Sequence, residues 1–177
     1  MRLKINKELS IKRSKLSYHF NTELLFHRIY ENAILIILLM LPVFAALNHN
    51  YHNSSFVYYA ILLFWLFTLW HVYFINSLTI ISGSNENLNR MMIVKIIKSR
   101  YPDLKINDSG QQVIRCTKST GLLTWGKQLT VIFDQDRIFL NLTTFGRYKV
   151  RSLFHAYFAT IEMKKIKKEF RNMLEAN

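Results

Sequence analysis

Charged side chains are missing from a long central stretch, Asn32 through Asn85, although the 177-residue chain carries a formal net charge of +13. A charge at the centre of a lipid bilayer costs about 2.5–3.5 kcal/mol on insertion scales. A soluble domain of this length has no reason to avoid charge for so long, so the stretch favours a membrane protein. Two buried helices of a soluble all-α core are the alternative, but the remaining chain is too short to surround them.

Cysteine is nearly absent, since Cys116 is the only one in the chain. An intramolecular disulfide is therefore excluded, and with it a disulfide-stabilised secreted domain. A lone thiol is typical of a reducing cytosol. The basic first residues are similar to the n-region of a signal peptide, but the apolar run that follows is too long and lacks a cleavage site. We therefore expect this segment to be retained.

Motifs of catalysis and of cofactor binding are lacking too. The sequence has no glycine-rich phosphate loop and no paired-carboxylate motif. His49 and His52 lie three positions apart in the connecting segment, but no cysteine pair or acidic residue there completes the four ligands of a zinc site. A nucleophilic site could be assembled only from Cys116, Ser152 and His155, and no motif surrounds them. We therefore expect no catalytic residues, no metal and no cofactor.

Two long apolar runs fill the uncharged stretch, and a short polar segment separates them. A helix needs about 20 residues to cross a hydrocarbon core of roughly 30 Å. We therefore predict a transmembrane hairpin over residues 29–82, with spans at about 29–48 and 56–81. Pro42 lies inside the first span, where neighbouring helices can satisfy the carbonyl that it frees.

Two polar side chains lie within the second predicted span, His71 and Asn76. Polar groups in lipid form hydrogen bonds with neighbouring helices, so we expect both to make intramembrane polar contacts. A proton or ion path is the functional alternative. It is not favoured, because neither span contains an acidic residue other than Glu31 at the start of the first.

Basic residues flank the hairpin on both sides, and its connecting segment has none. The positive-inside rule therefore places both termini in the cytoplasm. Residues 1–28 form a basic N-terminal segment in which apolar residues recur every four positions, at Leu16, Phe20 and Leu24. Either this segment is an interfacial amphipathic helix, or Asn21 or Thr22 caps a helix that continues into the first span.

The periodicity of apolar residues over 83–177 predicts a cytosolic α+β domain made of a helix, an antiparallel sheet and a C-terminal helix. Asn85 or Asn87 can cap the first helix, expected at residues 85–101, and Pro102 ends it near Tyr101. The sheet is expected to have five or six strands, of which two form a hairpin around Asp134-Gln135-Asp136. The predicted strands are 111–118, 128–134 and 137–143, with shorter ones at 122–125 and 147–151.

The segment WGKQLTVIFDQDRIFLN, from Trp125 to Asn141, is followed by the basic YKVRSLF and the final helix. In this order of parts the chain resembles bacterial pleckstrin-homology-like membrane proteins of the YcxB-like type. The resemblance implies a membrane hairpin joined to a small cytosolic β-rich domain that a C-terminal helix closes. It also implies residence in the bacterial cytoplasmic (inner) membrane. A complete pleckstrin-homology sheet has seven strands, more than the sequence indicates here.

The C-terminal helix, about residues 155–175, separates apolar from basic side chains. Its apolar side is expected to contain Phe158, Ile161, Ile166 and Phe170. Its basic side contains Lys164, Lys165, Lys167, Lys168 and Arg171. These cations are candidates for contact with anionic lipid or a protein partner, and the alternative is an ordinary solvated face. A nucleic-acid partner is not favoured, because no aromatic residues are interleaved with them at a known spacing.

The expected function is a non-enzymatic, membrane-anchored module that binds a protein partner or anionic lipid at the cytoplasmic face. An immunity protein against a membrane-acting toxin is the alternative, because the chain is small and combines two spans with a compact surface. A membrane enzyme of unknown reaction is the third possibility. The sequence does not define the oligomeric state.

Overall fold

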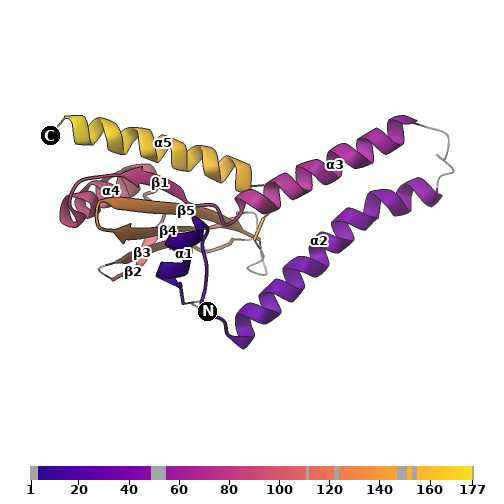
Figure 1. The fold of residues 1–177 in the computed structure, drawn as a ribbon, viewed down its shortest axis with the longest axis horizontal. Coiled ribbons are helices and arrows are strands. Elements are labelled where there is room, and N and C mark those ends of the chain that lie inside the picture. The colour runs from indigo at the N-terminus through magenta and orange to yellow at the C-terminus, as the bar shows by residue number, and fades with distance from the viewer. Residues whose placement is uncertain are drawn as a thin grey trace.

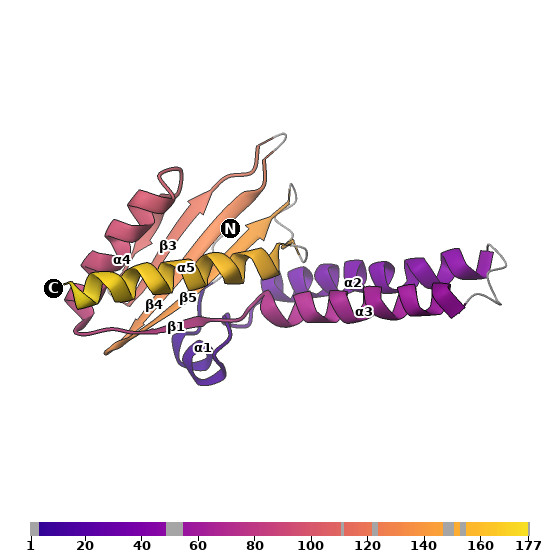
Figure 2. The same ribbon diagram turned by 90° about the horizontal axis from the view of Figure 1, so that it is seen from above.

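A computed structural model of the chain shows a five-stranded sheet domain from which two long apolar helices project (Figure 1). The structure describes residues 4–48, 55–110, 112–121, 124–146, 151–152 and 155–176. The projecting helices are α2 (Thr22–Asn48) and α3 (Ser55–Phe74). Figure 1 shows that the two helices lie closest at their outer ends and diverge toward the domain, and in Figure 2 they overlap. Leu24–Phe44 and Phe56–Phe74 are long and apolar enough to cross a membrane, and almost none of their residues are buried.

A cap of the predicted kind begins α2. The backbone amide of Leu24 donates a hydrogen bond to Asn21 Oδ1 at 2.7 Å. The prediction of a capped helix that continues into the first apolar run is therefore confirmed, whereas Leu16 is buried at 5% exposure rather than on an interfacial helix. The residues before the cap form only a short helix, α1 (Lys7–Arg13).

The second apolar run is helical over a shorter range than its composition predicts. Helix α3 ends at Phe74, and Thr79–Ser82 form the strand β1. The prediction of a span through residue 81 was therefore wrong at its C-terminal end. The physical reason is that the β-branched residues Thr79, Ile80 and Ile81 pair with a strand of the domain, which hydropathy alone does not distinguish from a helix end.

The sheet is antiparallel throughout, in the order β1-β5-β4-β3-β2. Its other strands are β2 (Lys105–Ser109), β3 (Val113–Lys118), β4 (Gly126–Asp134) and β5 (Arg137–Phe145). Five strands agree with the lower predicted number, but β1 and β2 were not predicted. The shorter strands expected at 122–125 and 147–151 fall partly outside the described residues. Of the second, Arg151 forms an isolated bridge with Phe145.

The predicted β-hairpin is confirmed. Strands β4 and β5 pair from Gly126–Phe145 to Asp134–Arg137. Gln135 in the turn has a φ of 53°, in the left-handed region that a tight hairpin turn requires.

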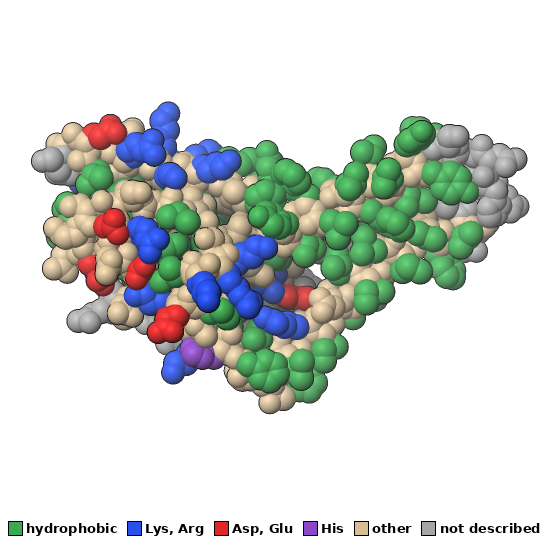
Figure 3. Space-filling model, viewed as in Figure 1, with side chains coloured by type: hydrophobic (Ala, Val, Ile, Leu, Met, Phe, Trp, Pro, Cys, Tyr) green, Lys and Arg blue, Asp and Glu red, His purple; other side chains and the backbone are tan. Residues whose placement is uncertain are grey.

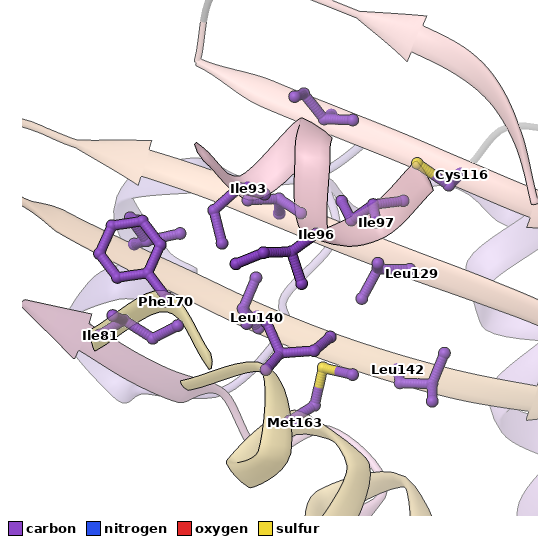
Figure 4. Packing of buried hydrophobic residues seen from close by; sticks show 14 of the residues in the cluster. Ile81, Ile93, Ile96, Ile97, Cys116, Leu129, Leu140, Leu142, Met163 and Phe170 are labelled. Carbon is purple, nitrogen blue, oxygen red and sulfur yellow. The ribbon is translucent and has the colours of Figure 1, made fainter. Parts of the chain in front are cut away.

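One face of the sheet packs against two helices, α4 (Glu86–Arg100) and α5 (Ala156–Glu175). Figure 4 shows side chains from both helices meeting those of β1, β4 and β5. The interface contains Ile81, Ile93, Ile96, Ile97, Leu129, Leu140, Met163 and Phe170.

The buried side of α5 differs from the predicted one. It consists of Ala156, Ala159, Met163, Ile166 and Phe170, which recur at spacings of three and four. Phe158 is 63% exposed, and Ile161 is only partly buried, so their assignment to the apolar side was wrong. Phe158 does not share the spacing of these buried residues, so its side chain points away from the sheet.

The N-terminal segment covers the opposite face of the sheet. Leu16 and Leu78 pack there against Ile132 and Phe139, which alternate with the residues of the first core. The amide of Leu16 donates to the carbonyl of Asn76 at 2.7 Å. The sheet domain therefore includes the N-terminal segment and β1, rather than beginning at residue 83.

Candidate functional site

The hairpin and the sheet domain meet at an ion pair between Glu31 of α2 and Arg151, which lies beside the end of β5. Arg151 Nε donates to Glu31 Oε1 at 2.6 Å, and Nη2 donates to Oε2 of the same carboxylate. Nη1 donates to Asn76 Oδ1, just after α3. The two charged side chains are 17% and 20% exposed. This geometry is the bidentate arrangement that gives an arginine–carboxylate pair both strength and direction.

Opposing effects act on the Arg151 guanidinium. Burial is the largest, and it lowers the pKa because it disfavours the charged form. The hydrogen bonds and the charge of Glu31 outweigh burial, so the pKa of Arg151 is raised. Tyr18 is close by, and burial raises the pKa of its phenol although the charges of Arg151 and Arg115 oppose this. Arg151 is therefore cationic at any physiological pH.

A cleft of about 320 Å³ opens beside this ion pair, between α2 and α3. It is lined by Arg28, Glu31, Asn32, Ile34, Leu35, Val72, Ile75, Asn76 and Arg151. Figure 3 shows Lys and Arg side chains gathered beside a hollow where the hairpin leaves the domain. The cleft is thus polar and basic toward the domain and apolar toward the hairpin.

Sequence reasoning noted Glu31 as the only charge between residues 29 and 82, but it did not identify this cleft. Arg28, Glu31, Asn32 and Leu35 follow the spacing i, i+3, i+4, i+7, so one face of α2 was recognisable. Arg151 lies 120 positions from Glu31, and no pattern in the sequence connects the two.

The structure describes one of the two side chains for which intramembrane contacts were predicted. Asn76 lies after the end of α3 and contacts Arg151, so its assignment to a span was wrong because the helix ends at Phe74. His71 lies in α3, and its side chain is outside the described part of the structure. Trp65 Nε1 of α3 donates to the carbonyl of Leu39 in α2 at 2.8 Å, and this hydrogen bond joins the two hairpin helices.

The basic side of α5 is a second candidate site, which we call the α5 cationic face. It comprises Lys164, Lys165, Lys167, Lys168 and Arg171. Lys165 Nζ donates to Glu162 Oε1 at 2.6 Å. Among the side chains that the structure describes, no carboxylate pairs with the other four cations. Figure 3 shows blue side chains along the upper edge, where α5 runs, leading away from the hairpin.

The three possible nucleophilic residues do not form one site. Ser152 Oγ and His155 Nδ1 lie 2.6 Å apart just before α5, and the His155 ring packs against Trp125 in a tilted arrangement, with centroids 4.8 Å apart and 46° between the ring planes. Cys116 lies in β3 with no exposed surface, on the sheet face that α4 and α5 cover. Burial raises the pKa of its thiol to about 11, which suits a structural cysteine.

Within the described residues, no group of three or more His, Cys, Asp or Glu side chains could hold a metal ion. Comparison of the chain with family models, with curated proteins and with solved structures finds no match. The cleft and the α5 cationic face are therefore the two candidate sites.

Proposed function

We propose that the chain is a non-enzymatic, membrane-anchored module whose cytosolic domain binds an acidic protein through the α5 cationic face. The observation that carries this proposal is a row of four cations on α5, for which the described side chains include no carboxylate partner, while the other side of the helix is buried against the sheet. The proposed location is the bacterial cytoplasmic membrane, with the hairpin inserted and both termini cytoplasmic.

Exposure of the hairpin supports its insertion. Large apolar side chains such as Phe44, Phe56 and Leu63 are 65%, 80% and 66% exposed. A core helix of a soluble protein would bury most such side chains. Trp125, which packs against His155 just before α5, is exposed, and so are Tyr157 and Phe158 in the first turn of α5, as expected of side chains at a membrane–water interface.

The position of the cations along α5 favours a protein over the anchoring leaflet. The first turn of α5 lies against the end of α3, and the helix then runs away from the hairpin (Figures 1 and 2). At a rise of about 1.5 Å per residue, Lys164 lies roughly 12 Å and Arg171 roughly 22 Å beyond Ala156. Surface charges are largely screened beyond about 8 Å at physiological salt. The α5 cationic face therefore points at the cytosol more than at lipid headgroups.

The test uses the full chain in lipid nanodiscs and a polyglutamate peptide as the probe. The triple variant Lys164→Gln/Lys168→Gln/Arg171→Gln is compared with a control, Lys95→Gln/Lys98→Gln/Lys127→Gln, which removes the same charge from exposed positions elsewhere. We expect the peptide to bind about tenfold more weakly to the first variant and normally to the control. Equal weakening in both variants would show that only net charge matters, and would refute the proposal.

A second measurement tests lipid as the partner. Acylation of Lys164 and Lys168 by an amine-reactive reagent is followed in nanodiscs of neutral and of anionic lipid. We expect equal acylation in both. Protection by anionic lipid without added peptide would assign the face to the leaflet instead.

The relationship to YcxB-like proteins stays a prediction. An antiparallel sheet with a C-terminal helix packed on one face is the feature that supports it. The immunity role also stays a prediction, and a toxin reading frame next to the gene is the observation that would favour it.

A further inference from the structure

The cleft between α2 and α3 has the composition of an amphipathic binding site. Arg28, Asn32, Asn76 and the Glu31–Arg151 pair form its polar end. Ile34, Leu35, Val72 and Ile75 form its apolar wall. The polar end lies where the hairpin meets the domain, which is the depth of the headgroups if the hairpin is inserted. A ligand that fits must therefore be polar at one end and apolar at the other.

The charges at the polar end of the cleft indicate which ligands it can bind. The Glu31 carboxylate neutralises Arg151 through the bidentate contact, which leaves the cleft with one net positive charge from Arg28. No described carboxylate lies within ion-pair distance of the Arg28 guanidinium. A ligand with a single negative charge would balance the site, and arginine with amide donors is a typical phosphate-binding set.

We propose that this cleft binds one phospholipid, with its phosphodiester held by Arg28 and the amides of Asn32 and Asn76. The lipid's glycerol and first acyl carbons lie along Leu35 and Val72. A volume of about 320 Å³ is near the lower limit of small-molecule sites, so it holds the phosphate and glycerol rather than whole acyl chains. This inference rests on the proposed membrane anchorage but not on the α5 cationic face.

Arg151 has a positioning role in this site. Its contacts with Glu31 and Asn76 join the two sides of the cleft, since Glu31 belongs to α2 and Asn76 follows α3. The Asn76 amide oxygen accepts from Arg151, which directs the amide nitrogen of Asn76 away from the guanidinium and leaves it as a donor. The ion pair therefore fixes the positions of the residues on the two sides of the cleft.

The experiment measures lipid retention by the full chain, purified in detergent, with native mass spectrometry. The probes are phosphatidylglycerol and a diacylglycerol with the same acyl chains, which differ only in the phosphoglycerol headgroup. We expect the wild type to retain one phosphatidylglycerol and no diacylglycerol. Arg28→Gln should retain it about tenfold less, and Arg28→Lys should recover part of the loss because it restores the charge.

A matched control is Arg13→Gln, which removes an exposed arginine from α1 outside the cleft. It should retain phosphatidylglycerol as the wild type does. Equal retention by Arg28→Gln and Arg13→Gln, or equal binding of diacylglycerol, overturns the proposal. Displacement of the lipid by millimolar glycerol 3-phosphate also overturns it, because the site would then take a free phosphate.

Washing membranes with alkaline carbonate separates this inference from the proposed function. Release of the chain by carbonate would refute membrane anchorage, on which both proposals depend. A chain that stays in the membrane but does not discriminate between the two lipids refutes the phospholipid site alone.

Discussion

Removing one partner of the Glu31–Arg151 pair is expected to destabilise the junction between hairpin and domain. In Arg151→Met the Glu31 carboxylate, 20% exposed, loses both guanidinium donors. Breaking a fully buried pair in this way costs about 3–5 kcal/mol, and removing an exposed pair about 0–1 kcal/mol. The partial exposure of this pair places the expected loss near the lower end of the first range, at about 3 kcal/mol.

Thermal unfolding in one detergent measures this loss. A change of about 1 kcal/mol shifts the Tm of a chain of this size by about 2–4 °C, so Arg151→Met should lower it by about 6–12 °C. The control is Lys118→Met, which removes an ion pair with Asp103 whose side chains are 38% and 66% exposed. The control should lower the Tm by no more than about 4 °C.

A double-mutant cycle tests whether the two side chains act together. Glu31→Gln keeps the shape of the side chain and removes its charge. If the pair is coupled, the double variant Glu31→Gln/Arg151→Met should be more stable than the two single losses predict, by about 1–3 kcal/mol. Additive losses, or an Arg151→Met shift as small as that of Lys118→Met, would refute the reasoning.

Four further predictions concern the sheet domain. Cys116 should resist alkylation at pH 8 in the native state, because a pKa of about 11 leaves roughly one thiol in a thousand ionised; rapid labelling without unfolding would contradict this. Its raised pKa stabilises the fold below pH 9, and this contribution should be lost as the pH rises from about 9 to about 11, which urea titrations at several pH values can measure. Gly83→Ala places a Cβ 2.1 Å from Oδ1 of the buried Asn89 and should cost about 1–3 kcal/mol in the same titrations, whereas an unchanged midpoint would contradict the packing. Asn85→Ala removes the acceptor for the Leu88 amide at 2.8 Å and should lower the Tm by about 2–4 °C, and an unchanged Tm would argue against the cap.

Elements with local signals could be predicted from the sequence. Asn85, one of the two expected caps, begins α4, and the turn at Asp134–Asp136 joins two alternating strands. The final helix begins within one residue of the expected His155. In each case the residues that determine the element lie within a few positions of it, so composition and spacing are sufficient.

Elements that depend on distant partners could not be predicted. β2 has the sequence KINDS, in which only Ile106 is apolar and is 38% exposed, so its strand conformation comes from pairing with β3. β1 continues the apolar run of α3 without a break in hydropathy, and pairing with β5 separates it from the helix. Tertiary pairing overrides a weak local pattern in both.

The cleft could not be predicted either, because it depends on a contact between residues that lie far apart in the sequence. Glu31 looks like an isolated charge at the edge of an uncharged run, and an unpaired carboxylate there would oppose insertion of α2. Its partner Arg151 forms a bridge with Phe145, the last residue of β5, and that strand is held by β1 and β4. The charge at the start of the hairpin is therefore neutralised only when the sheet has formed. Folding of the domain and packing of α2 against it are consequently coupled through this one pair. A substitution in the domain or in α2 should therefore change the stability of both.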